Sequence, residues 1–177
     1  VTASSEAVLG WAPDTMVREF APDYLPIDED HPVGAQEAYG LSKIACEAIV
    51  RSYTAKCGME TVVLRPPWVI SPEELEALGE TGGVTPTRFA LFHYVDTRDL
   101  AEAFRLAIER PLDGCQVLFT GSGESTVDEP LCSLYPRLMP AIGNRASSLT
   151  GIRSSVSNEL ARKVLGWVPK RSWRQSR

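Results

Sequence analysis

Residues 60–70 read ETVVLRPPWVI, and this stretch decides the fold class. The segment from Thr61 to Leu64 is an apolar run without polar alternation, and Pro66 and Pro67 end it. Such a run is typical of a strand covered on both faces, because the helices of a parallel α/β sheet pack on both sides of it. The run therefore predicts a buried strand of a parallel sheet.

Two further strands and several helices are predicted around this run. VTASS (1–5) is typical of a strand end, and CQVLFTGSG (115–123) begins with another buried strand. A helical pattern runs from about Ala35 to Cys57, and Gly58 is placed to end it. Strands that alternate with helices indicate an α/β fold with a mostly parallel sheet.

The segment HYVDTRDLAEAFRLAIERP (93–111) shows the clearest helical pattern in the chain. Asp96 or Thr97 can cap its start, and Pro111 ends it. The predicted buried stripe consists of Leu100, Ala103, Phe104, Ala107 and Ile108.

The other segments give weaker patterns. We expect a short helix and a Gly-rich loop in 71–92, and a closing helix in 157–169 with Ser157 as its N-cap and Gly166 as its stop. Residues 124–152 show little periodicity. The basic tail PKRSWRQSR (169–177) is expected to be disordered.

Composition excludes several classes of function. The chain has 177 residues, of which 44% are hydrophobic and 23% charged, with a net charge of −5. Without clustered Lys and Arg, nucleic-acid binding is not favoured, and no run is long enough to cross a membrane. Four scattered cysteines and two histidines do not make a metal site, and we expect reduced thiols and a cytoplasmic location.

Tyr39 and Lys43 are the sharpest candidates for chemistry. A spacing of four places both side chains on one face of a helix. A free tyrosine has a pKa of about 10, and a nearby ammonium group lowers it, so that a tyrosine can transfer a proton at neutral pH. The alternative is an ordinary amphipathic helix with a surface Tyr and Lys.

Ser4 and Ser5 follow the first predicted strand, at the edge where parallel α/β sheets place their sites. Ser5 can donate a hydrogen bond to a substrate oxygen and hold it beside Tyr39. The alternative for both serines is simple capping of a loop or helix.

Six segments together resemble the NAD-dependent epimerase/dehydratase family of extended short-chain dehydrogenases/reductases. They are SSEAVLG, AYGLSKIACE, LRPPWVISP, HYVDTRDLAEAF, VLFTGSGEST and ARKVLGWVP, in the order that this family shows. The resemblance implies an incomplete Rossmann-like parallel sheet with helices and a small C-terminal substrate-binding region. It places the back part of an NAD(P)-binding domain in 1–70, and a substrate-binding region with returning sheet elements in 71–177.

The resemblance also implies roles for particular residues. Ser5, Tyr39 and Lys43 would be the catalytic set, with Tyr39 as the general acid/base and Lys43 on the nicotinamide ribose. Ser4, Pro66 and Val69 would lie against NAD or NADP. His93, Tyr94 and Arg98 would lie near a small-molecule substrate, and no metal is implied.

The sequence departs from the family in two places. The Gly-rich pyrophosphate fingerprint is absent, and TGSGEST (120–126) does not replace it, because the third glycine position holds Thr126. With Val1 as the first residue, we expect a truncated chain that lacks the front of the fold. The segment between Pro72 and His93 is short, which favours a small sugar or sugar acid over a nucleotide sugar.

Two hypotheses follow. In the first, the chain is part of an NAD(P)-dependent oxidoreductase or epimerase that acts by reversible hydride transfer on a carbohydrate, with homodimers formed through the Tyr39 helix. In the second, it is an inactive or partner-dependent fragment without independent cofactor binding. The residue that distinguishes NAD from NADP would follow a strand missing here.

Overall fold

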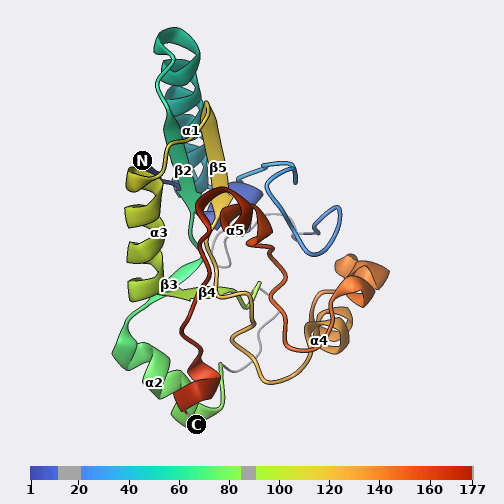
Figure 1. Ribbon diagram of the computed structural model, residues 1–177. Helices are drawn as coiled ribbons and strands as arrows, with labels where there is room; N and C mark the ends of the chain where they lie inside the picture. Colours follow the sequence, from blue (N-terminus) through green and yellow to red (C-terminus); the bar gives the residue numbers. More distant parts are fainter. Residues whose placement is uncertain (12–20, 85–90, 177) are drawn as a thin grey trace.

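A three-stranded parallel sheet forms the centre of the computed structural model, which describes residues 1–11, 21–84 and 91–176 (Figure 1). Its strands, in the spatial order β1-β2-β5, are β1 (Thr2–Ala3), β2 (Thr61–Arg65) and β5 (Cys115–Phe119). All of β2 is buried, and both of its pairings are parallel. The predicted parallel α/β sheet is confirmed.

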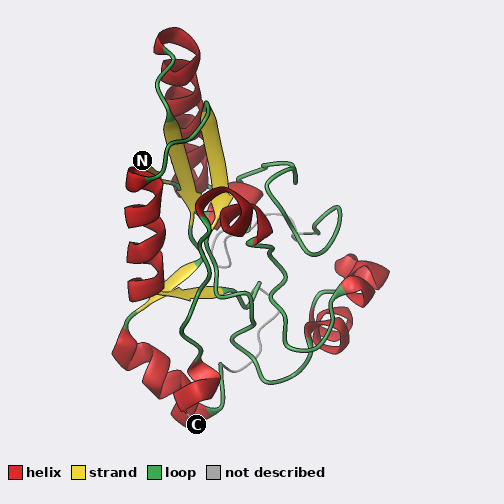
Figure 2. Ribbon diagram, in the orientation of Figure 1, coloured by secondary structure: helices red, strands yellow, loops and turns green. Residues whose placement is uncertain are grey.

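A second, two-stranded parallel sheet follows β2 after the Pro66–Pro67 step (Figure 2). It pairs β3 (Trp68–Ile70) with β4 (Tyr94–Asp96). The prolines lack N–H donors and therefore separate β2 from β3. The stretch from Thr61 to Ile70 thus contributes one strand to each of the two sheets.

Helix α1 (Ala38–Cys57) lies along β2 and extends past the sheet (Figure 1). It begins three residues after the predicted start, because the Glu37 side chain accepts hydrogen bonds from the backbone N–H groups of Tyr39 and Gly40. Gly58 ends it as predicted, with a left-handed φ of 65° that glycine adopts without steric cost.

Helices α2 (Pro72–Thr81) and α3 (Thr97–Glu109) follow β3 and β4. Asp96 caps α3, and Ala103 and Ala107 are buried as predicted. The prediction for Ile108 is wrong, since this side chain is 73% exposed. Ile108 lies roughly 100° around the helix from Ala107, on the side that faces away from the core.

The C-terminal third contains elements that the sequence pattern did not reveal. Within 124–152 the chain forms α4 (Leu131–Leu138) and the 3-10 segment η2 (Pro140–Ser148). Helix α5 (Glu159–Leu165) follows, with Asn158 rather than Ser157 at its N-cap position. The Ser157 hydroxyl still accepts a hydrogen bond from the Glu159 N–H at 3.2 Å.

The expectation of a disordered tail is wrong. The tail ends in a 3-10 turn, η3 (Trp173–Ser176), and the Trp173 side chain is fully buried. Its indole N–H donates to the Ser125 carbonyl at 2.9 Å, and the Arg174 guanidinium pairs with Glu124 at 2.9 Å. The buried indole and these polar contacts hold the tail against the rest of the fold.

No helix in the described part of the chain is long and apolar enough to span a membrane. Among the same residues, no three His, Cys, Asp or Glu side chains are grouped so that they could hold a metal ion. The predicted division at residue 70 stays a prediction.

Candidate functional site

The two predicted catalytic residues of α1, Tyr39 and Lys43, lie on one face of this helix. The Lys43 ammonium lies 5.4 Å from the centroid of the Tyr39 ring and donates to the Ala3 carbonyl at 3.1 Å. The Tyr39 side chain is 54% exposed. The helix therefore presents an accessible phenol beside a cation that is tied to the end of β1.

The two serines after β1 have different surroundings. Ser4 is buried, and its hydroxyl donates to the Glu47 carboxylate at 2.6 Å. The Ser5 hydroxyl accepts the Ala7 N–H at 3.2 Å and so caps the short 3-10 helix η1 (Glu6–Leu9). Because this bond uses an acceptor position, the Ser5 hydroxyl proton remains for another oxygen.

Helix η1 and the start of α1 touch at Gly40. A Cβ at this position would lie 2.7 Å from the Ala7 carbonyl oxygen, so the contact requires a glycine. Ser5 precedes η1 and Tyr39 precedes Gly40. The backbone segments that carry the predicted catalytic serine and tyrosine are thus packed against each other.

A buried ion pair anchors the same face of α1, and sequence reasoning missed it. The Glu47 carboxylate accepts two hydrogen bonds from Arg65, at 2.9 and 2.8 Å. Burial alone would raise the pKa of Glu47, but the hydrogen bonds from Arg65 and Ser4 outweigh burial and hold that pKa below its ordinary value. The sequence did contain a signal for Glu47. It follows Tyr39 and Lys43 at the same spacing of four residues and so lies on their face of the helix.

Pro66 and Val69 lie where β2 ends and β3 begins. The Pro66 carbonyl accepts the Glu6 N–H at 3.0 Å, which joins this segment to the turn after Ser5. Val69 and its neighbour Trp68 are exposed although both are apolar. The start of β3, two residues after this contact, therefore offers exposed apolar surface.

His93, Tyr94 and Arg98 have separate acidic partners. His93 is buried and contacts the Glu6 carboxylate through Nδ1 at 3.0 Å. Arg98 is partly exposed and pairs with Asp96 through two bonds at 2.9 and 2.8 Å.

Tyr94 lies in the interior and contacts the C-terminal tail. Its hydroxyl donates to Glu124 at 2.5 Å and accepts the Trp173 N–H at 3.3 Å. Burial, together with the Glu124 carboxylate, raises the pKa of Tyr94. Of the three residues implied near the substrate, Arg98 is the one with an exposed side chain.

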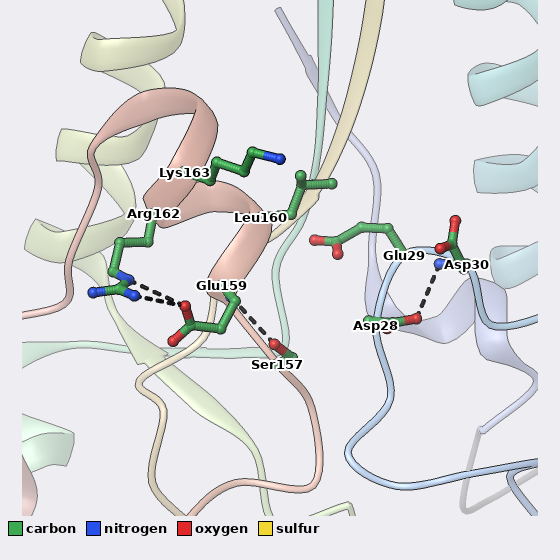
Figure 3. Close-up of a pocket in the computed structure, with 8 residues that line it drawn as sticks. All are labelled: Asp28, Glu29, Asp30, Ser157, Glu159, Leu160, Arg162 and Lys163. Carbon is green, nitrogen blue, oxygen red and sulfur yellow. Dashed lines mark hydrogen bonds and ion pairs between the residues drawn. The ribbon is translucent and has the colours of Figure 1, made fainter.

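A cavity of about 690 Å³ lies between the loop 28–30 and α5 (Figure 3). Asp28, Glu29 and Asp30 line one side, and α5 forms the other, where Arg162 turns to Glu159 at 2.9 Å. The residues that line this cavity do not include Ser5, Tyr39 or Lys43. The cavity and the predicted catalytic set are therefore different features of the molecule.

The parallel sheet with helices beside it defines a Rossmann-like α/β fold. The model of the NAD dependent epimerase/dehydratase family matches residues 1–117. The chain belongs to this family.

Known proteins agree with this assignment. The UDP-glucose 4-epimerase of Rhizobium meliloti (strain 1021) is 26% identical over 182 residues, which cover 84% of this chain and 56% of that protein. The chain thus spans about half the length of the curated relatives that match it over most of its residues.

Solved structures share the fold. A short-chain dehydrogenase/reductase superfamily protein from Agrobacterium tumefaciens with bound NAD gives a TM-score of 0.66 at 22% identity, covering 98% of this chain and 63% of that chain. Uronate dehydrogenase from Agrobacterium tumefaciens gives a TM-score of 0.59 at 19% identity, covering 98% of this chain and 47% of that chain.

Proposed function

We propose that this chain belongs to an NAD(P)-dependent oxidoreductase or epimerase that acts on a sugar, a sugar acid or a nucleotide sugar. The observation that carries this proposal is the packing of the Ser5 turn against the start of α1, where Lys43 lies over the Tyr39 ring. Family membership supports the reaction class.

Ser5, Tyr39 and Lys43 have different roles at the substrate hydroxyl. The Ser5 hydroxyl donates a hydrogen bond to the substrate oxygen and so orients the substrate. Tyr39 accepts the hydroxyl proton during oxidation and returns it during reduction. Lys43 places a positive charge beside the Tyr39 ring, and its hydrogen bond to the Ala3 carbonyl keeps it beside the end of β1.

The residues present fit a nicotinamide nucleotide. Val69 and Trp68 offer exposed apolar surface for a ring, and Tyr39 and Lys43 offer polar groups for ribose hydroxyls. Ser4 is buried, with its hydroxyl bonded to Glu47 and its N–H bonded to the Leu64 carbonyl, so it supports the site from below and offers no free donor to the nucleotide. When bound, the nucleotide would accept a hydride from the substrate in oxidation and return one in reduction.

Three observations bear on the substrate class. The Rhizobium meliloti relative is a UDP-glucose 4-epimerase, whereas the short segment between Pro72 and His93 favours a smaller carbohydrate. Asp96 holds Nε and Nη2 of the Arg98 guanidinium, so Nη1 is the nitrogen left to donate to the carboxylate of a sugar acid.

We also propose a homodimer formed through α1. Leu41, Ile49 and Tyr53 are exposed apolar side chains at spacings of four and eight, so they form one stripe along this helix.

Calorimetric titration of NAD⁺ and of NADP⁺ into the full chain tests the proposal first. Micromolar binding that weakens in Lys43→Ala but not in Lys56→Ala, a lysine near the far end of α1, is the expected result. No heat with either nucleotide would favour the alternative, a chain without independent cofactor binding.

Turnover is then measured on a panel of sugars, sugar acids and nucleotide sugars. Net release of NAD(P)H identifies a dehydrogenase, whereas product without net release identifies an epimerase. A chain that binds nucleotide but converts no member of the panel would contradict the proposed substrate class.

A further inference from the structure

Glu6 and His93 form a buried pair that joins distant parts of the chain. The His93 Nδ1 atom lies 3.0 Å from Glu6 Oε2, and the two side chains are 1% and 6% exposed. Nδ1 is therefore the ring nitrogen that faces the Glu6 carboxyl group. The pair links the turn after β1 to the residue that precedes β4.

Glu6 sits at the centre of the turn that holds Ser5. Its backbone N–H donates to the Pro66 carbonyl at 3.0 Å, and the next residue, Ala7, donates its N–H to the Ser5 hydroxyl at 3.2 Å. Any rotation of Glu6 therefore moves the group to which the Ser5 hydroxyl is bonded.

His93 cannot follow such a rotation, because its ring is packed against backbone. A Cβ at Gly121 would lie 1.5 Å from His93 Nε2, so the ring stands directly over this glycine. The strand bridge to Ser125 fixes the backbone of His93 as well. Nε2 has no hydrogen-bond partner within the described residues, which leaves Nδ1 to make the ring's hydrogen bond.

The Glu6 carboxylate in turn depends on His93. A buried carboxylate without a partner is costly, because desolvation is then not offset by hydrogen bonding. Removal of the imidazole would therefore drive Glu6 toward solvent and turn the segment that carries Ser5. A side chain at 93 that keeps a donor in the place of Nδ1 would prevent this movement.

We propose that Glu6 and His93 are positioning residues that hold the Ser5 hydroxyl in its reactive direction. His93 acts through Glu6 and does not touch the substrate. This inference rests on the role of Ser5 given under the proposed function. It changes the expectation for His93 from substrate contact to control of the turn after β1.

Three variants of the full chain separate the possibilities. His93→Leu removes the donor, His93→Asn keeps an N–H near the position of Nδ1, and Glu6→Gln keeps an acceptor without the charge. Hydrogen exchange of the Ala7 amide reports the Ser5 bond directly. The Glu74 amide is a matched control, because it donates to the Ser71 hydroxyl at the same 3.2 Å in the cap of α2.

In His93→Leu we expect exchange of the Ala7 amide to accelerate about tenfold or more, while exchange of the Glu74 amide is unchanged. In the separate variants His93→Asn and Glu6→Gln, the Ala7 amide should exchange as slowly as in the parent chain. With a substrate from the panel, kcat in His93→Leu should fall about 10- to 100-fold with KM changed less than about twofold, since a misplaced catalytic group costs turnover rather than binding. His93→Asn should recover most of kcat.

Unchanged Ala7 exchange in His93→Leu would overturn the positioning role, whatever the kinetics. A rise in KM alone would overturn it too, and would assign His93 to substrate contact. If no substrate is converted by the parent chain, the proposed function fails, and the exchange measurement still decides whether His93 holds the Ser5 turn.

Discussion

Glu47 and Arg65 form a buried, two-bond ion pair that clamps α1 onto β2. The carboxylate also accepts the Ser4 hydroxyl at 2.6 Å, so one side chain joins the helix to two neighbouring strands. Since Tyr39 and Lys43 share the helix face of Glu47, the clamp sets the position of both along the strand ends.

Loss of one partner of this pair should destabilise the fold strongly. Glu47→Ala leaves the Arg65 guanidinium buried without its counterion, and we expect the free energy of unfolding to fall by about 3–5 kcal/mol. Urea unfolding measures it. Glu109→Ala removes an exposed partner of Arg105 on α3 and should change the free energy little. Equal effects of the two substitutions would contradict the clamp.

The same pair predicts how stability depends on pH. The pKa of Glu47 in the folded state lies below its ordinary value of 4.5, so the pair contributes fully above that value and its contribution is lost as pH falls through the folded-state pKa. Urea unfolding from pH 6 to pH 3 should show a steeper loss below about pH 4.5 in the parent than in Glu47→Gln. Parallel curves would argue against a lowered pKa.

Tyr39→Phe should abolish proton transfer and leave nucleotide binding largely intact. Turnover is expected to fall by a factor of at least about 100, while the calorimetric affinity for the nucleotide stays close to that of the parent. Tyr53→Phe is a matched control, since Tyr53 lies on the same helix and is 53% exposed. Parent-like turnover in Tyr39→Phe would remove the acid/base role.

Ile49→Asp should shift the mass in solution toward that of a single chain. Ile49 is 57% exposed on the apolar stripe of α1, where a buried carboxylate would be costly. Light scattering after size exclusion gives the mass. Ile108→Asp on α3 introduces the same change at an exposed isoleucine outside the stripe and should leave the mass unaltered. A dimer that survives Ile49→Asp would refute the α1 interface.

Trp173→Ala should cost about 3–5 kcal/mol in the free energy of unfolding, because a fully buried indole is deleted. Val168→Ala, at an exposed position in the same terminal segment, should have a small effect. Chemical unfolding of both variants measures the contrast. A small loss in Trp173→Ala would mean that the tail does not anchor the fold.

Local pattern was enough to predict the three strands of the central sheet and the long helices. It missed β3 and β4, and residues 94–96, at the start of the segment with the clearest helical pattern, form a strand instead. The apolar run from Thr61 to Leu64, which became β2, and the stop at Gly58 are short-range signals. The Tyr39–Lys43 spacing was equally visible, although the catalytic role of these residues stays a prediction. In each case a few neighbouring residues determine the outcome.

Other features depend on contacts that no local pattern contains. Helix α4 includes Pro136, which weakens its pattern, and it is held by burial of residues such as Leu134. Trp173 is flanked in the sequence by polar residues, but in the fold it packs in a cluster with Leu75 and Tyr94 and bonds to Ser125, all far earlier in the chain. The partner of His93 likewise lies 87 residues away, at Glu6.

The close approach of Gly121 to His93 links the evolutionary histories of three positions. A side chain at 121 can be accommodated only after the residue at 93 has become smaller. Where the smaller residue has no donor, that step also removes the partner of Glu6, and position 6 must then change as well. Homologues with a larger residue at 121 should therefore carry at 93 either a small donor such as Asn, with Glu6 kept, or an apolar residue, with Glu6 replaced.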